Sequence, residues 1–298
     1  MKTVSVIIPT YKNRGGLSDS INSVLSQECQ NLIEIIVVDD NDPSSEFRSS
    51  TMSLMAQYAE NPLVRYICHE ANKNGAAARN TGIKAAKGDY IAFLDDDDLF
   101  LPNKLNLQVE YLENHKDRDA VYCFARRGGK VVSTTALEGN GIRNILLLQS
   151  NYFTPSLMFR HNVLETINGF DETFRRHQDY DLMLRFFDAG FTIGCVQEVL
   201  IEIGLNKGEN IPTGEKVNQL KSYFFEKFNG FIEKEDKKTP GFKKIVYAKH
   251  YAGVFLNHVR NKNLRMAINT LCKYFPKSPK TFMGVIWKSI VIHIKGEA

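Results

Sequence analysis

The sequence is poor in the features that mark secreted, disulfide-bonded and membrane-spanning chains. Its five cysteines are an odd number, lie far apart and form no C-x-x-C pair, which favours a reduced, cytoplasmic protein. The N-terminal apolar run is too short for a signal peptide and is interrupted at Pro9 and Thr10. The most apolar late segment, residues 281–294, contains Lys288 and falls short of the ~20 residues of a bilayer span. We therefore expect no transmembrane helix.

The motifs of common nucleotide-binding loops are also missing. G-x-G-x-x-G does not follow the first predicted strand, and G-x-x-x-x-G-K-S/T does not occur. An EF-hand is excluded at the aspartate run 95–98, because the glycine and the distal glutamate of its loop are missing. If the chain binds a nucleotide, other groups must hold the phosphates.

Acidic residues are scarce in the last fifth of the chain. The sequence has 298 residues, 43% of them hydrophobic and 24% charged, which is typical of a globular protein with one large domain or one domain and an appendage. From Thr239 onward, eleven Lys or Arg residues face one acid, Glu297, so this segment carries about +10 while the whole chain carries +4. Such asymmetry indicates an anionic partner, either a membrane surface or nucleic acid.

The first hundred residues alternate between two hydrophobic patterns. Compact β-branched runs, such as TVSVIIPT and IEIIVV, predict buried strands, and NRGGLSDSINSVLSQ has apolar residues at helical spacing. The strands are apolar on both faces and are separated by helices. This pattern predicts an α/β fold with a parallel sheet that helices cover on both sides.

Polar residues follow three of these strands. PTY ends the first strand, Asp39 and Asp40 end the second, and Asp95–Asp98 end the fourth. Ligands bind beyond the carboxyl ends of such strands, so we expect the site at this edge. Consecutive carboxylates suit a hard cation such as Mg²⁺ or Mn²⁺, which often completes its shell with substrate phosphates. The residues alone therefore predict a diphosphate held through a metal ion.

Four segments in order then make a specific resemblance. VSVIIPTYKNRGGLSDSINSVLSQ, EIIVVDDND, NKNGAAARNTGIKAAKGDYIAFLDDDDLFLPNKL and NGFDETFRRHQDYDLMLRF resemble the inverting family-2 glycosyltransferases over roughly residues 3–200. The resemblance implies a GT-A (nucleotide-diphospho-sugar transferase) fold with a mainly parallel central sheet flanked by helices. We expect a catalytic domain at 1–204, with a nucleotide-binding half at 1–100 and an acceptor-binding half at 101–204. Residues 205–298 are predicted to form a mobile loop and a helical, basic appendage.

The resemblance also implies roles for single residues of the donor site. They are Pro9, Thr10 and Tyr11 around the base, Asp39 on its imino edge, Arg79 on the nucleotide or its diphosphate, Asp95 on the ribose, Asp96 beside it, and Asp97 as the main ligand of Mn²⁺ or Mg²⁺. The alternative is structural. In this interpretation, Asp39 and Asp40 are solvated acids of a loop. The aspartate run then caps the N-terminus of the helix that follows.

The acceptor half carries the expected base. Residues 151–160 are predicted to form a strand with Thr154–Ser156, either near the sugar or simply in the core. Gln178 stands where the family has the acid of a Glu-Asp pair. A glutamine cannot take a proton, so Asp179 is expected to be the catalytic base, with Asp181 as the fallback.

These features predict a metal-dependent inverting glycosyltransferase. The expected donor is a nucleotide diphosphate sugar, with a UDP-sugar favoured, and the expected acceptor is a saccharide or a lipid-linked saccharide in surface polysaccharide or lipopolysaccharide synthesis. The alternative is a non-catalytic sugar-nucleotide-binding or scaffold subunit. A helix over 281–294 would suit an anionic membrane surface on the inner face of the cell membrane, or would pack on the protein or a second copy. Nucleic acid is not expected, because no nucleic-acid module accompanies the tail.

Overall fold

The structure is a computed structural model that describes residues 2–12, 15–132, 136–150, 152–174, 176–204 and 213–294. Its contacts divide the chain into two units. The first comprises residues 1–141 and 151–205, and the second comprises 142–150 and 206–298. The predicted functional boundaries stay a prediction, but the contacts assign 142–150, which lies in the predicted acceptor half, to the helical unit. The loop is predicted over residues 204–216, and its residues 205–212 lie outside the described residues.

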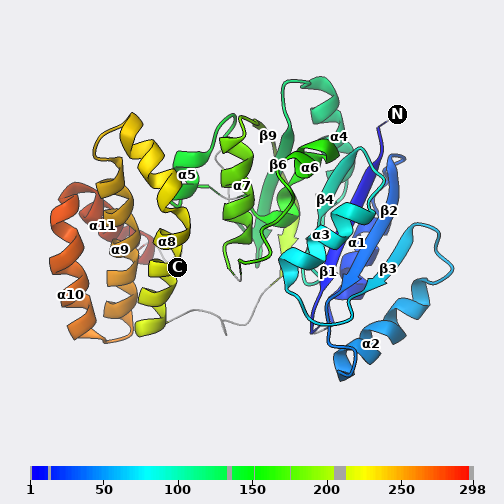
Figure 1. The fold of residues 1–298 in the computed structure, drawn as a ribbon, viewed down its shortest axis with the longest axis horizontal. Helices are drawn as coiled ribbons and strands as arrows, with labels where there is room; N and C mark the ends of the chain where they lie inside the picture. The colour runs from blue at the N-terminus through cyan, green and yellow to red at the C-terminus, as the bar shows by residue number, and fades with distance from the viewer. Residues whose placement is uncertain are drawn as a thin grey trace. The chain divides into compact units, whose positions relative to one another are not determined.

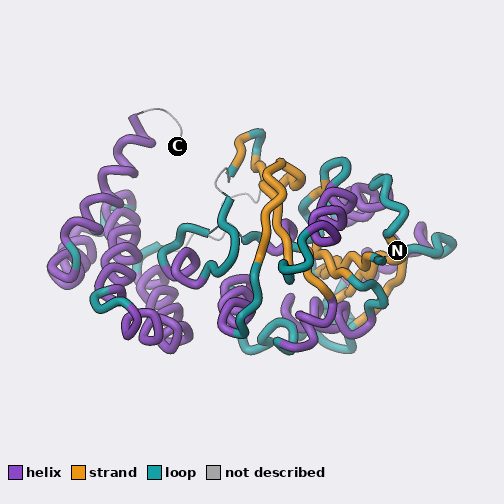
Figure 2. The backbone as a smooth tube through the Cα atoms, turned by 90° about the horizontal axis from the view of Figure 1, so that it is seen from above, coloured by secondary structure: helices purple, strands orange, loops and turns teal. Residues whose placement is uncertain are grey.

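The first unit begins with the alternation that the sequence predicts. Its elements are β1 (Val4–Thr10), α1 (Leu17–Leu25), β2 (Leu32–Asp39), α2 (Glu46–Met55), η1 (Ala56–Tyr58), β3 (Val64–Cys68), α3 (Gly75–Ala85) and β4 (Tyr90–Phe93). The strands β3, β2, β1 and β4 are neighbours in this order, and all three pairings are parallel. Figure 1 shows these strands side by side, and Figure 2 shows helices on both sides of the sheet.

The remaining elements of this unit add antiparallel pairings. They are β5 (Leu99–Phe100), α4 (Lys104–Asn114), β6 (Ala120–Arg127), β7 (Lys130–Val131), η2 (Thr154–Ser156), β8 (Met158–Arg160), α6 (His161–Thr166), α7 (Gln178–Asp188) and β9 (Ile193–Ile203). The sheet order is β3-β2-β1-β4-β8-β6-β9-β5, with β7 beside β6. β8 is antiparallel to both β4 and β6, whereas the long β6–β9 pairing is parallel. The sheet is therefore mixed, and its longest pairings are parallel.

The core forms where strands and helices share apolar faces. Ile7 and Ile36 are fully buried on adjacent central strands, because helices cover both faces of the sheet. On α1, Leu17, Ile21 and Val24 lie on one face at helical spacing and are fully buried. This packing fixes the start of α1 against the end of the sheet where the polar residues lie.

The strand predicted over residues 151–160 is wrong in its first half. Thr154–Ser156 form a 3-10 turn, and only Met158–Arg160 form a strand. Pro155 has no N–H for a sheet, and both the backbone N–H and the hydroxyl of Ser156 donate to the Phe153 carbonyl, at 2.8 and 2.7 Å. These local bonds replace the ladder that a strand would need.

The second unit is helical. It consists of α5 (Ile142–Leu146), α8 (Glu215–Lys238), α9 (Phe242–Arg260), α10 (Leu264–Tyr274), η3 (Phe275–Lys277) and α11 (Pro279–Ile294). Phe224 and Phe228 on α8 are fully buried, and His250 on α9 hydrogen-bonds the Leu146 carbonyl at 2.9 Å. Within the described part of the chain, no helix combines the length and hydropathy needed to cross a bilayer.

Candidate functional site

The ends of three adjacent strands meet at one edge of the sheet. Thr10, the last residue of β1, is in register with Asp39 of β2, and its carbonyl accepts from the Asp40 N–H at 2.9 Å. On the other side, the Thr10 hydroxyl donates to the Asp96 carboxylate at 2.5 Å. The structure therefore brings together the three groups of polar residues that the sequence places at strand ends. Pro9 is partly buried in β1, and Tyr11, just beyond the strand, is 47% exposed.

Residues 95–98 form a tight turn, here called the aspartate turn. The Asp98 N–H donates to the Asp95 carbonyl at 3.1 Å, and the Ser20 hydroxyl of α1 donates to the Asp98 carbonyl at 2.8 Å. Two glycines pack directly on the turn. A Cβ at Gly16 would lie 2.5 Å from the Asp96 carbonyl oxygen, and one at Gly204 would lie 2.2 Å from the Asp97 carbonyl oxygen. The turn is thus held between the start of α1 and the end of β9, and only glycine fits at either contact.

The four carboxylates of the turn have different environments. Asp95 pairs with Arg79 at 2.5 Å, Asp96 accepts from Thr10, and buried Asp98 accepts from the Gly204 N–H at 2.8 Å. Burial, reinforced by the negative charges of neighbouring aspartates, raises the pKa of Asp96 to about 6 and that of Asp98 to about 8. Asp97 is the exposed member. Negative charges therefore lie close together in this turn.

The turn does not cap the following helix. α4 begins at Lys104 after Asn103, which makes no side-chain capping bond, and Asp98 instead binds the backbone of Gly204. The structural alternative for the aspartate run, a helix cap, is therefore wrong.

Arg79 connects the aspartate turn to the start of α7. Its guanidinium donates to Asp95 through one nitrogen and to the Gln178 side-chain oxygen, at 3.1 Å, through another. α3 carries Arg79 and starts at a well-formed cap, because the Asn74 side chain accepts from two N–H groups of its first turn. A Cβ at Gly75 would lie 3.2 Å from the Arg79 guanidinium. The site is crowded where α3 begins.

Asp179 lies in the first turn of α7 and is partly buried. Burial raises its pKa to about 6, and the positive charge of Arg79 partly opposes this rise. The fallback Asp181 is buried and pairs with Arg185, with Asp181 Oδ2 2.7 Å from one guanidinium nitrogen and 2.8 Å from another. Asp181 is therefore engaged in a structural pair, which leaves Asp179 as the carboxylate whose environment suits a base.

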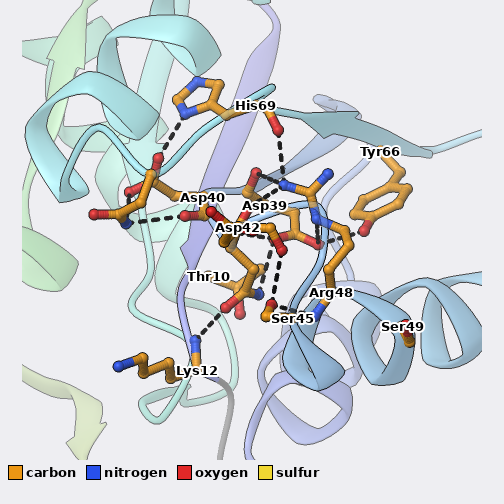
Figure 3. Close-up of polar contacts among 12 residues, drawn as sticks. Thr10, Lys12, Asp39, Asp40, Asp42, Ser45, Arg48, Ser49, Tyr66 and His69 are labelled. Carbon is orange, nitrogen blue, oxygen red and sulfur yellow. Dashed lines mark hydrogen bonds and ion pairs between the residues drawn. The ribbon is translucent and has the colours of Figure 1, made fainter.

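Asp39 is at the predicted edge but is enclosed by the protein. Its carboxylate is fully buried and accepts from the N–H and the side-chain amide of Asn41, both at 2.8 Å. It also accepts from the Tyr66 hydroxyl and forms an ion pair with Arg48 at 3.1 Å (Figure 3). Contact with a nucleotide base stays a prediction for Asp39, and it would require the carboxylate to exchange one of these four partners.

Asp40 is equally enclosed. Its carboxylate lies 2.7 Å from His69 Nδ1 and accepts from the N–H groups of Lys73 and Asn74, at 2.8 and 2.9 Å. Both Asp39 and Asp40 are at most 1% exposed. The alternative interpretation of these two residues as solvated loop acids is therefore wrong.

The partners of these two aspartates were not predicted from the sequence. Arg48 is the third residue of α2. Its guanidinium also donates to the His69 carbonyl at 2.8 Å. Tyr66 comes from β3, whose register with β2 places Tyr66 opposite Val37. Tyr66 and His69 lie in and just after the strand that follows β2 in the sequence, and this position could have indicated them. No pattern in the sequence indicates Arg48.

A metal ion would need donors from outside the protein here. In the described ranges, no group of three or more His, Cys, Asp or Glu side chains is arranged to hold a metal. Mg²⁺ and Mn²⁺ commonly bind through one or two carboxylates, several waters and substrate phosphates. An exposed Asp97, beside carboxylates whose pKa values are raised by burial and by neighbouring negative charge, fits that shared mode of binding.

Comparison with known proteins identifies a family. The model of glycosyl transferase family 2 matches residues 5–181. Putative glycosyltransferase EpsE of Bacillus subtilis is 32% identical over 211 residues, which cover 67% of this chain and 72% of EpsE. An uncharacterized glycosyltransferase of Rickettsia prowazekii is 30% identical over 249 residues, which cover 78% and 73% of the two chains.

Solved structures share the fold at lower identity. The crystal structure of residues 1–349 of S. aureus TarS in complex with UDP-GlcNAc has a TM-score of 0.66 and 19% identity, and the match covers 95% of this chain and 83% of that one. The complex of the same TarS fragment with UDP has a TM-score of 0.58 and 18% identity, with 95% and 92% covered. These similarities confirm the GT-A fold with C-terminal helices.

Proposed function

The chain belongs to glycosyl transferase family 2, and on this premise we propose that it transfers a sugar, with inversion, from a nucleotide diphosphate donor to a saccharide or lipid-linked acceptor. The expected setting is surface polysaccharide or lipopolysaccharide synthesis. A UDP-sugar is the favoured donor, because TarS, which shares the fold, has been solved with UDP-GlcNAc and with UDP.

One observation carries this proposal. Arg79 reaches both Asp95 of the aspartate turn and Gln178, the residue next to Asp179. Three segments that are far apart in the sequence are thereby joined, with a cation, an acidic turn and a candidate base side by side. An inverting transfer needs these components, because the donor diphosphate and the attacked carbon lie between the anion-binding groups and the base.

Asp179 would act as the general base. The acceptor hydroxyl attacks the anomeric carbon from the face opposite the diphosphate, the new glycosidic bond forms as the bond to the diphosphate breaks, and Asp179 takes the hydroxyl proton. A pKa of about 6 leaves this carboxylate mostly ionised at pH 7, yet makes it a stronger base than an ordinary aspartate. No covalent nucleophile is required.

The negative charge of the donor diphosphate would be neutralised by Arg79 and by a cation bound to the aspartate turn. Asp97, which is exposed, would hold Mn²⁺ or Mg²⁺ together with the donor phosphates, and Asp95 and Asp96 would border the nucleotide. A bound cation supplies Lewis-acid neutralisation of the departing diphosphate. Thr10 holds Asp96 through a hydrogen bond, and Gly204 packs on the backbone of Asp97 and donates to Asp98, so the turn is supported by these contacts.

Substitution of the base tests the proposal. Asp179→Asn should lower turnover by about 10²–10⁴-fold while nucleotide binding persists, because only the proton acceptor is lost. Asp188→Asn, at the exposed end of the same helix, is the matched control and should keep full turnover. In the unsubstituted enzyme, turnover should rise with pH through about 6 as Asp179 loses its proton. Full turnover by Asp179→Asn would refute the assignment of the base.

Sugar transfer, measured together with donor binding, separates the enzyme from the alternative function. Gln178, in place of the family's acid, favours a non-catalytic sugar-nucleotide-binding or scaffold subunit. Calorimetry with UDP, GDP, dTDP and CDP, with and without Mn²⁺, should find one nucleotide whose metal-dependent binding Asp97→Ala abolishes. Binding of that kind without hydrolysis or transfer of any nucleotide sugar would favour the scaffold.

A further inference from the structure

The helix α11 presents apolar side chains to solvent although one of its faces is packed. Phe282 is fully buried and contacts the rings of Phe255 and Phe275, which anchors the helix in its unit. The exposed apolar side chains are Met283 at 50%, Trp287 at 69% and Ile290 at 44%. They are spaced four and three residues apart, so they form one stripe along the helix. Phe282 points inward and does not belong to this stripe.

Basic residues border this stripe. Lys280 precedes Met283 by three residues and Trp287 by seven, which places it on the same face, and Lys288 directly follows Trp287. Both lysines are exposed. The positive charge of Lys288 also contributes to the lowered pKa of Lys249 on α9, behind the larger effect of burial, so positive groups lie close together.

α9, α10 and α11 themselves carry no acidic residue. The sequence has ten Lys or Arg residues and no Asp or Glu between Thr239 and Ile294. Of these ten basic residues, Lys243 forms an ion pair in the described part of the chain, with Glu233 of α8. α10 repeats the pattern, with Leu264 and Ile268 at least 60% exposed. The unit therefore combines exposed apolar side chains with uncompensated positive charge.

We propose that α11 docks on an anionic lipid surface, with Met283, Trp287 and Ile290 inserted at the level of the headgroups and with Lys280 and Lys288 on the lipid phosphates. A helix with Trp and aliphatic residues beside lysines is suited to such an interface, where apolar burial and attraction to anionic lipids add together. The helix lies along the surface in this arrangement, since Phe282 on its other side is held by the protein.

A second copy of the chain fits the stripe less well. Two such surfaces would bring lysines together, because the set contains no acid to pair with them. Three side chains also cover much less than the roughly 800 Å² per partner that a stable interface buries. The positive charge of the surface therefore favours a partner that is negatively charged and that spreads over a wide area.

Trp287 provides a direct readout, because it is the single tryptophan of the sequence. The full-length protein is mixed with vesicles of phosphatidylcholine alone or with 30% phosphatidylglycerol, and tryptophan emission and co-sedimentation are recorded. We expect a blue shift and co-sedimentation with the anionic vesicles only, and quenching of Trp287 by lipids brominated on the acyl chain. Absence of both effects on anionic vesicles would overturn the proposal.

Variants assign the effect to this surface. Lys280→Gln with Lys288→Gln should weaken binding to anionic vesicles about thirtyfold. Trp287→Ser with Ile290→Ser should weaken it at least tenfold by co-sedimentation. Met52→Ser, which alters a 54% exposed residue of α2 in the other unit, is the control and should bind as the parent does. Equal binding by all three variants would overturn the assignment, as would a stable dimer in solution that shields Trp287 from iodide without vesicles.

This proposal does not depend on the proposed reaction. Loss of vesicle binding in the α11 variants with unchanged turnover on a soluble acceptor would support membrane docking by itself. A failure of the Asp179→Asn experiment would leave the lipid result unaffected.

Discussion

Two groups of aspartates at the same edge of the sheet have opposite surroundings. Asp39 and Asp40, after β2, are at most 1% exposed and accept hydrogen bonds or ion pairs from Arg48, Tyr66 and His69. In the aspartate turn after β4, Asp97 is exposed, and burial together with neighbouring negative charge raises the pKa of the flanking acids. Asp39 and Asp40 are stabilised by Arg48 and by hydrogen-bond donors, whereas the aspartate turn holds closely spaced negative charges that a bound cation would stabilise. Similar sequence patterns thus serve scaffold and site.

The largest expected effect comes from breaking the buried ion pair between Arg48 and Asp39. Arg48→Met should lower the free energy of unfolding by about 3–5 kcal/mol, because it leaves the buried Asp39 carboxylate without its ion-pair partner. Urea denaturation at pH 7 measures this. Asp97→Asn, the counterpart in the turn, should change the free energy of unfolding by less than about 0.5 kcal/mol. An equal loss of unfolding free energy in the two variants would contradict the distinction between Asp39 and the aspartate turn.

Crowding of the aspartate turn gives the next effect. Gly204→Ala should cost about 1–3 kcal/mol of stability and weaken nucleotide binding, because the new Cβ would lie 2.2 Å from the Asp97 carbonyl oxygen. Gly253→Ala, on α9 with no atom within 4 Å of the added Cβ, should instead stabilise by about 0.5–1 kcal/mol. Thermal denaturation and calorimetry measure both effects. A Gly204→Ala protein that binds nucleotide normally would show that the turn can shift.

Ionised Asp179 should lower the stability of the fold, whereas Asp39 and Asp40 should increase it. The folded-state pKa of Asp179, about 6, is higher than the unfolded value of about 3.9, so its ionisation opposes folding above pH 4 and does so fully above pH 6. Asp179→Asn should therefore raise the free energy of unfolding by about 1–2 kcal/mol at pH 7, and the gain should vanish near pH 4. Denaturation at several pH values tests this. A gain that is independent of pH would contradict it.

The smallest effect tests the link through Arg79. Gln178→Glu places a carboxylate 3.1 Å from the guanidinium and next to Asp179, so Arg79 would be shared between two acids. The added negative charge should raise the pKa of Asp179 by about one unit, seen as an alkaline shift of the turnover profile. Gln178→Met removes the hydrogen bond without adding charge and should leave the profile in place. Identical shifts in the two variants would show that the hydrogen bond, not the charge, sets the pKa of Asp179.

The sequence predicted the parts of the fold that depend on periodicity. The strands and helices up to β4, and the meeting of Thr10, Asp39 and the aspartate turn at one edge, follow from apolar runs and from the geometry of parallel sheets. The turn at Thr154–Ser156 was missed because local hydrogen bonds to Phe153 compete with an apolar run that resembles a strand. The enclosure of Asp39 was missed because its cation, Arg48, comes from a helix whose pattern contains no sign of burial.

One contact of the helical unit has a consequence for how the chain is made. The His250 side chain and the Leu146 carbonyl are 104 residues apart in the sequence. At ordinary rates of translation the ribosome needs about 5–20 s to make that length, so α5 leaves the ribosome well before its partner helix exists. Ile142, Ile145 and Leu146 are buried in the finished protein and would be uncovered during this interval. A fragment cut after residue 204 would keep them uncovered, and such a fragment is expected to aggregate.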